Sequence, residues 1–152
     1  MEQRFKSFSA VMLMLIRNVD DEEEILLQKR KNTGYMDGYY DFSASGHVED
    51  KETMRMAMVR EAKEELGIDI NINDLEFVTM IHKWSNGTPY YNGYFKTTKW
   101  KNEPIINEPE KNEEIKWFKL NNLPENLIDD RKQAIEDYKN KTYYSEFGWE
   151  AN

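Results

Sequence analysis

The most informative stretch of this sequence is residues 46–68, which read GHVEDKETMRMAMVREAKEELGI. Its second half predicts a helix over residues 53–66, because it lacks Gly and Pro and is rich in Met, Ala, Glu, Lys and Arg. Gly67 then supplies the residue that commonly follows the last turn of a helix. The stretch therefore predicts a helix of about four turns with a defined end.

The glutamates of this helix lie close together on one side of it. A rotation of about 100° per residue places the apolar side chains on one face. The members of this face are Met58, Val59, Ala62 and Leu66. Glu61, Glu64 and Glu65 fall on a shoulder of the same face, whereas a solvated surface would lie opposite it. Like charges at this spacing repel one another, so a neutralising partner is expected.

Two partners could neutralise these carboxylates. The first is ordinary pairing along the helix, such as Arg60 with Glu64. The second is a divalent cation. The chain has no cysteine and two histidines, so its ligands would be oxygen atoms, which favours Mg²⁺ or Mn²⁺ over zinc.

With its flanks, the stretch resembles the Nudix box in full. It consists of Gly46, five residues, Glu52, seven residues and then Arg60-Glu61-Ala62-Lys63-Glu64-Glu65-Leu66-Gly67-Ile68. A chance match to so many fixed positions at fixed spacing is very improbable. The resemblance extends to the order of elements along nearly the whole chain. It implies an α/β (α+β) fold, a Nudix-like α/β/α sandwich in which helices flank a central mixed β-sheet.

The resemblance also implies a metal site. Glu61, Glu64 and Glu65 match the metal-binding carboxylates of the family, and the backbone carbonyl of Gly46 matches a further ligand. Glu61 is the first candidate for the base that takes a proton from the attacking water. The expected cofactor is Mg²⁺ or Mn²⁺.

Other matched positions have supporting roles. Arg60 and Glu52 match a pair that orients the loop and the helix. The acidic loop at residues 107–114 is similar to a loop of MutT-like nucleotide pyrophosphatases, so Glu110 or Glu113 could add a ligand or assist the base. A solvated run of charges is the other interpretation of this loop.

Substrate contacts are expected from outside the box. Arg30 matches a position that often contacts substrate phosphate, although it could also be a surface arginine at a strand end. Aromatic rings that could stack on a nucleobase, or simply belong to the core, are Tyr35, Tyr39, Tyr40 and Trp84. His47 and His82 lack the spacing of a metal pair and are interpreted as structural.

The rest of the chain predicts one domain over residues 1–152. Expected strands cover residues 8–16, 24–29, 39–42, 75–83, 90–100 and 115–120, and a closing helix covers residues 129–140. The aromatic tail at residues 143–149 is expected to pack against the domain. A homodimer contact is the alternative for this tail.

The composition of the chain argues against two kinds of partner, duplex nucleic acid and a lipid bilayer. The formal net charge is −8 and the isoelectric point is near 4.9, so a basic surface for duplex nucleic acid is not expected. The longest apolar run, Ala10 to Ile16, is far shorter than the roughly 20 residues that span a bilayer. The absence of cysteine favours a reducing compartment, with the cytoplasm as the default.

These features and the resemblance imply Mg²⁺-dependent hydrolysis of a nucleoside diphosphate linked to another group. A nucleoside triphosphate, canonical or modified, would give a monophosphate and pyrophosphate in the MutT-like manner. Alternative substrates are ADP-ribose, a nucleotide sugar, a dinucleoside polyphosphate or a capped RNA. A non-catalytic nucleotide-binding module is a further alternative. The isoprenoid isomerase branch of the fold relies on a cysteine, which this chain lacks.

Overall fold

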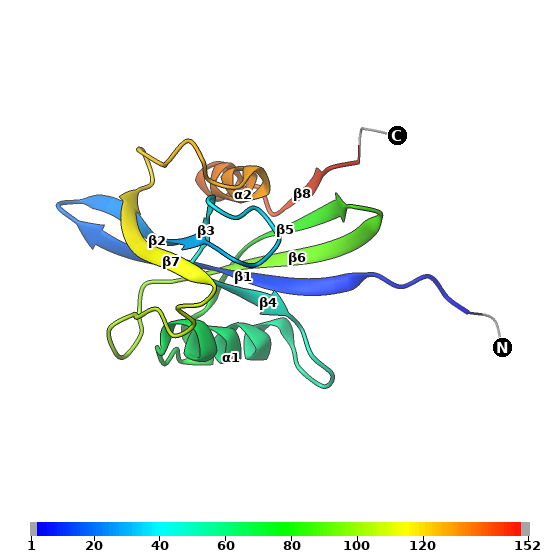
Figure 1. Cartoon of the computed structure of the whole chain (residues 1–152), viewed down its shortest axis with the longest axis horizontal. Coiled ribbons are helices and arrows are strands. Elements are labelled where there is room, and N and C mark those ends of the chain that lie inside the picture. Colours follow the sequence, from blue (N-terminus) through cyan, green and yellow to red (C-terminus); the bar gives the residue numbers. More distant parts are fainter. Residues whose placement is uncertain (1–2, 150–152) are drawn as a thin grey trace.

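The computed structural model describes residues 3–149 and contains a twisted sheet between two helices (Figure 1). Its strands are β1 (Phe8–Val19), β2 (Glu22–Arg30), β3 (Tyr40–Phe42), β4 (Ala44–His47), β5 (Glu76–Ser85), β6 (Thr88–Thr97), β7 (Asn112–Lys119) and β8 (Tyr144–Phe147). Its helical segments are α1 (Met54–Leu66), the short 3-10 helix η1 (Ile72–Asp74) and α2 (Asp129–Asn140). The predicted strands and helices are all present, and β4 and β8 are additional.

Mixed pairing defines the sheet. The strand order is β3-β2-β1-β6-β5-β8, with β4 paired to β1 and β7 paired to β2. β1 is parallel to β6 and antiparallel to β2 and β4. Residues 8–15 of β1 pair with β6 and residues 16–19 pair with β2, so this long strand joins the two parts of the sheet.

The apolar run of β1 is buried on both faces. Val11, Leu13 and Leu15 belong to the core cluster that includes α1. The alternate residues Met12, Met14 and Ile16 belong to the cluster that includes α2. A strand covered on both faces is expected to be continuously apolar. Figure 1 shows α1 and α2 on opposite sides of the sheet, which confirms the predicted sandwich.

Local signals set the ends of α1. The Thr53 hydroxyl accepts a hydrogen bond from the Met56 N–H at 3.1 Å, which satisfies one of the free donors of the first turn. Gly67 follows the last turn with φ of 68°, a left-handed conformation that glycine adopts without strain. The buried face is Ala57, Met58, Ala62 and Leu66. Val59, which was expected in this face, is only partly buried.

The aromatic tail completes one edge of the sheet. β8 lies parallel to β5, and the Trp149 ring lies 5.2 Å from the Trp84 ring. Packing of the tail against the domain is therefore confirmed, and a dimer contact stays a prediction. No helix within residues 3–149 combines the length and apolar character needed to cross a bilayer.

Candidate active site

The glutamates of α1 line a cleft of about 360 Å³, called here the glutamate cleft. Its remaining walls come from β2, β4 and the loop before β7. The residues that line it are Gln28, Arg30, Thr33, Ser45, Glu61, Glu64, Glu65, Glu108, Lys111 and Asn112. The structure thus brings the three predicted metal-binding carboxylates to one cleft.

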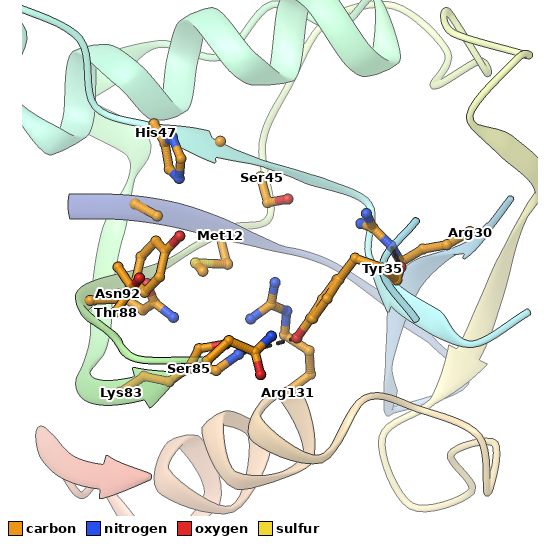
Figure 2. A pocket seen from close by; sticks show the side chains of 14 residues that line it. Met12, Arg30, Tyr35, Ser45, His47, Lys83, Ser85, Thr88, Asn92 and Arg131 are labelled. Atoms are coloured by element: carbon orange, nitrogen blue, oxygen red, sulfur yellow. Dashed lines mark hydrogen bonds between the residues drawn. The ribbon is translucent and has the colours of Figure 1, made fainter. Parts of the chain in front are cut away.

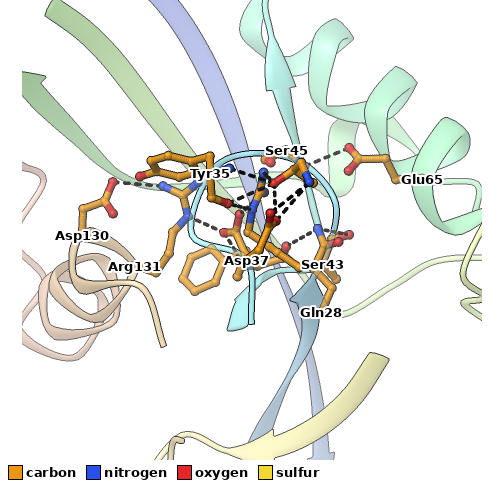
Figure 3. Close-up of polar contacts among 12 residues, drawn as sticks. Gln28, Tyr35, Asp37, Ser43, Ser45, Glu65, Asp130 and Arg131 are labelled. Carbon is orange, nitrogen blue, oxygen red and sulfur yellow. Dashed lines mark hydrogen bonds and ion pairs between the residues drawn. The ribbon is translucent and has the colours of Figure 1, made fainter. Parts of the chain in front are cut away.

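Strand β4 lies directly against these carboxylates. A Cβ atom at position 46 would stand 2.3 Å from Cδ of Glu61, so any larger residue there would force the Glu61 carboxylate to move. The Ser45 N–H donates a hydrogen bond to Glu65 Oε2 at 3.0 Å (Figure 3). Burial, together with the neighbouring Glu61, raises the pKa of Glu65. Glycine at position 46 therefore lets β4 approach the glutamates without displacing the Glu61 carboxylate.

Replacing Gly46 by alanine is expected to push the Glu61 carboxylate out of place. We expect the affinity for Mn²⁺, measured by titration calorimetry, to fall by about tenfold or more. Gly93→Ala is a suitable control, because its Cβ would meet chiefly the flexible Met54 side chain, with the sulfur at 2.7 Å. Equal affinity of Gly46→Ala and the unaltered protein would contradict this account of position 46.

Arg60 fixes the start of the box to the helix. It donates two hydrogen bonds to Glu52, from Nε at 2.6 Å and from Nη2 at 3.0 Å. Its Nη1 donates to Glu61 at 2.7 Å, and Nη2 also donates to the carbonyl of His47 at 3.1 Å. Glu64 accepts a longer contact from Nη1 at 3.3 Å. One guanidinium therefore joins the loop, β4 and two glutamates of α1.

The pairing with Arg60 makes one carboxylate sensitive to acid. Hydrogen bonds from Arg60, and from the Glu49 N–H, lower the pKa of Glu52 from 4.5 to about 2. Because the pKa is lower in the folded state, this stabilisation is present above pH 4.5 and is lost as the pH falls towards 2. Urea unfolding across this window should show a smaller acid-induced loss for Glu52→Gln than for the unaltered protein. Equal losses in the two proteins would contradict this prediction.

The loop before β7 brings a glutamate that differs from the predicted one. Glu108 lines the glutamate cleft, whereas Glu110 is exposed outside its lining and Glu113 pairs with Lys29 at 3.5 Å. The loop is held by α1, because the Asn107 N–H donates to the carbonyl of Glu65 at 3.1 Å. Such bonds satisfy the free carbonyls of the last helical turn and place Glu108 beside the glutamates.

A second cleft of about 360 Å³ adjoins the first, and Arg30 and Ser45 line both. We call it the aromatic cleft, because Tyr35 and Tyr90 line it together with His47. The rings of His47 and Tyr90 lie 5.9 Å apart. Figure 2 shows Tyr35 reaching across the cleft towards the side from which Arg131 and Lys83 project.

Buried ion pairs form the floor of the aromatic cleft. Arg131 donates from Nε to Asp41 at 2.6 Å and from Nη1 to Asp130 at 3.1 Å. Lys83 pairs with the same Asp130 oxygen at 3.0 Å, and Arg30 donates to Asp41 at 3.0 Å. Burial alone would raise the pKa of Asp130, but Arg131 and Lys83 lower it below its usual value. We call these five residues the buried ion network; Figure 3 labels two of them, Asp130 and Arg131.

The network also holds the loop that carries Tyr35. Arg30 Nε donates to the Tyr35 carbonyl at 2.8 Å, and Lys83 Nζ donates to the Tyr35 hydroxyl at 3.2 Å. Asp37 accepts hydrogen bonds from Thr33 and closes the loop on itself. Arg30 is therefore a partly buried residue that organises this loop and borders both clefts, rather than a solvated arginine at a strand end.

The other predicted aromatic contacts lie elsewhere. Tyr39 is 41% exposed and does not line either cleft. Trp84 packs against Trp149 with the two rings tilted by 47°, and Tyr40 packs edge-on against Phe118 in the core. Of the predicted rings, only Tyr35 is brought to the site. His47 was interpreted as structural from the sequence, but it lines the aromatic cleft.

The oxygen donors at the glutamate cleft fit a hard divalent cation. Within residues 3–149, no three acidic or histidine side chains enclose a common point as they stand, since Arg60 holds both Glu61 and Glu64. The chemistry nevertheless matches Mg²⁺ or Mn²⁺, because four of the lining side chains are carboxylates, none is a histidine or a cysteine, and β4 carries no side chain at Gly46. Glu61, Glu64, Glu65 and Glu108 would hold such an ion.

Comparison with known proteins decides the family. The NUDIX domain model matches residues 7–138. The chain belongs to the Nudix family. It is accordingly a hydrolase, and the resemblance to the Nudix family seen in the sequence is confirmed.

Two curated proteins and one solved structure are similar to this Nudix hydrolase in sequence or fold. It is 32% identical over 84 residues, 55% of the chain and 72% of the relative, to an 8-oxo-dGTP diphosphatase of Proteus vulgaris. It is 27% identical over 124 residues, 80% of the chain, to the NAD-capped RNA hydrolase NudC of Stutzerimonas stutzeri (strain A1501), of which it spans only 40%. A MutT NUDIX hydrolase from Burkholderia pseudomallei matches with a TM-score of 0.76 and 26% identity, over 88% of this chain and 98% of the other.

Proposed function

We propose that this Nudix hydrolase cleaves nucleoside triphosphates, canonical or modified, to a monophosphate and pyrophosphate with the help of Mg²⁺ or Mn²⁺. The observation that carries the proposal is the meeting of two unlike clefts at Arg30 and Ser45. One is lined by carboxylates suited to a metal-bound phosphate chain, and the other by rings and polar groups suited to a nucleobase. A nucleotide has these two parts.

The glutamates share one role in this proposal, and Glu61 has a second. Glu61, Glu64 and Glu65 from α1, with Glu108 from the loop and the Gly46 carbonyl, would hold the cation. When bound, the cation neutralises phosphate charge and lowers the pKa of a coordinated water. Glu61 accepts the proton of the water that attacks phosphorus, as the bond to the leaving phosphate oxygen breaks. Arg60 positions Glu61 through its 2.7 Å hydrogen bond.

The substrate contacts follow from the same geometry. Arg30 borders the glutamate cleft and is 19% exposed in its side chain, so it can offer positive charge to the phosphate chain. Tyr35 presents its ring at the aromatic cleft, where a base could stack on it. A chain with a net charge of −8 needs such localised cations to retain an anionic substrate.

The curated relative from Proteus vulgaris is named for a nucleoside triphosphate substrate, which supports this class over the others. The sequence contains no cysteine, which is consistent with a location in a reducing compartment such as the cytoplasm.

Hydrolysis of a substrate panel tests the proposal. The panel contains canonical and 8-oxo nucleoside triphosphates, ADP-ribose, a nucleotide sugar, a dinucleoside polyphosphate and NAD-capped RNA, with products identified by ion-exchange chromatography. We expect the highest kcat/KM with a triphosphate, and pyrophosphate rather than phosphate as the second product. A higher kcat/KM for another class would overturn the proposed substrate. Absence of turnover on every member, with nucleotides still raising the melting temperature, would show a binding module instead.

A further inference from the structure

Lys111 is a cation at the glutamate cleft that neither the metal site nor the proton transfer requires. It stands on the loop before β7 and lines the glutamate cleft but not the aromatic cleft. Its side chain is 57% exposed, and within residues 3–149 its Nζ has one charged partner, Glu108 at 3.9 Å. This separation is too long for a hydrogen bond, so the ammonium keeps its three donors for solvent or a ligand.

Backbone contacts hold the loop that carries Lys111 at both of its ends. At one end, Asn107 Nδ2 donates to the carbonyl of Glu64 at 2.9 Å. At the other end, the Lys31 N–H donates to the Lys111 carbonyl at 2.9 Å. The Lys111 N–H donates to the Glu108 carbonyl at 3.0 Å. None of these bonds uses the Lys111 side chain, so a change there tests its charge rather than the fold of the loop.

Arg30, which also lines the glutamate cleft, is already engaged by the protein. It donates from Nε to the Tyr35 carbonyl at 2.8 Å and from Nη1 to Asp41 at 3.0 Å. Its Nη2 donates to Thr33 at 3.1 Å, so all three nitrogens of the guanidinium have partners. Arg30 therefore presents a fixed charge where the two clefts meet, whereas the ammonium of Lys111 can follow a ligand.

The two adjoining clefts give a bound nucleotide a direction. Arg30 and Ser45 line both clefts, so a phosphate chain whose base lies in the aromatic cleft enters the glutamate cleft beside them. The phosphate next to the sugar would then lie near this junction. The group beyond the cleaved anhydride would lie further into the glutamate cleft, which Lys111 and Glu108 line. In a triphosphate this group is a pyrophosphate, and its terminal phosphate is the most highly charged of the chain.

The carboxylates of the cleft would repel the terminal phosphate unless positive charge stands beside it. The glutamates and the phosphate under attack would share any bound divalent cation. An ammonium on a flexible stem is a compact charge with three donors, which can stay with a phosphate as it leaves. Lys111 supplies such a charge, and its contact with Glu108 is weak enough to be exchanged for a phosphate oxygen.

We propose that Lys111 binds the terminal phosphate of the substrate and is a specificity-determining residue that favours nucleoside triphosphates over nucleoside diphosphates. The inference rests on the proposed function, because it places the base in the aromatic cleft and the phosphate chain in the glutamate cleft. It adds the residue that recognises the pyrophosphate end.

The substrates dGTP and dGDP isolate this contact, because they differ only in the terminal phosphate and both give dGMP. We expect kcat/KM to favour dGTP by about tenfold or more in the unaltered protein. In Lys111→Gln, kcat/KM for dGTP should fall by about tenfold, mainly through a higher KM, and that for dGDP should change little. Lys111→Arg keeps the positive charge and should retain most of the preference for dGTP.

Lys116→Gln is the matched control. Lys116 is exposed on β7 and lines neither cleft, and its replacement changes the net charge by the same amount. This variant should keep the preference for dGTP. Equal use of dGTP and dGDP by the unaltered protein, or an unchanged preference in Lys111→Gln, would overturn the proposal. An equal loss for both substrates in Lys111→Gln would also overturn it, because Lys111 would then act on a shared phosphate or on Glu108.

A binding measurement separates this proposal from the proposed function. Calorimetry with inorganic pyrophosphate in the presence of Mg²⁺ requires no turnover. An affinity about tenfold lower in Lys111→Gln than in Lys116→Gln would support the contact even if no triphosphate were hydrolysed. Equal affinities of these two variants would overturn the contact whether or not the protein hydrolyses triphosphates.

Discussion

Glu64→Gln is expected to lower the kcat of nucleotide hydrolysis by about a hundredfold or more, with little change in stability. Glu64 lines the glutamate cleft, and its side chain is 57% exposed. Its ion pair with Arg60 at 3.3 Å is of the partly solvated kind that contributes at most about 1 kcal/mol. Initial rates at saturating nucleotide and Mg²⁺, together with urea unfolding, measure both effects.

The control for this variant is Glu136→Gln, which removes an exposed carboxylate from α2 away from both clefts. It should hydrolyse nucleotide at the unaltered rate. Turnover by Glu64→Gln at the rate of the control would contradict the role of the glutamate cleft in the reaction.

Asp41→Asn is expected to cause the largest loss of stability. Asp41 is fully buried and accepts hydrogen bonds from Arg131 at 2.6 Å and from Arg30 at 3.0 Å. Asparagine has nearly the same size but removes the carboxylate partner of Arg30 and leaves Arg131 with Asp130 alone. Removing one partner of a buried pair costs about 3–5 kcal/mol of unfolding free energy. Urea unfolding at neutral pH measures this loss.

The matched control is Asp129→Asn, at the start of α2. The Asp129 side chain is 81% exposed and lies 3.8 Å from Lys132, so its loss should change the free energy of unfolding by less than about 1 kcal/mol. Similar unfolding free energies for Asp41→Asn and Asp129→Asn would show that the buried ion network does not stabilise the fold.

Much of the fold could be predicted because local signals agree with tertiary packing. The helix α2 begins at Asp129 and ends at Asn140, as predicted, and Gly67 ends α1. The two missed strands lack such signals. β4 reads Ala-Ser-Gly-His, a stretch poor in β-branched residues, and it is a strand because β1 provides its pairing partner.

Part of the candidate site could likewise be predicted from the sequence, and part could not. Spacing along one helix predicted that Glu61, Glu64 and Glu65 would lie together, and they line one cleft. Glu108 could not be distinguished from Glu110 by the sequence, because the path of their loop depends on hydrogen bonds to the end of α1. Loop conformation is a tertiary property that no spacing rule describes.

The aromatic cleft is the part of the site that the sequence predicted least well. Lys83 and Asn92 lie within predicted strands, and Arg131 lies within a predicted helix. A lysine and an asparagine in otherwise buried strands were the available signal, because such groups are costly to bury without a partner. The sequence does not reveal which partners they find.

Dependence of pyrophosphate release on the divalent cation tests the central claim most directly. The measurement is the rate of pyrophosphate formation from dGTP as Mg²⁺ is titrated, and again after addition of excess chelator. We predict saturable activation by Mg²⁺, abolition by chelator, and pyrophosphate with dGMP as the products. Pyrophosphate release at an undiminished rate in the presence of chelator would contradict the metal-dependent mechanism at the glutamate cleft.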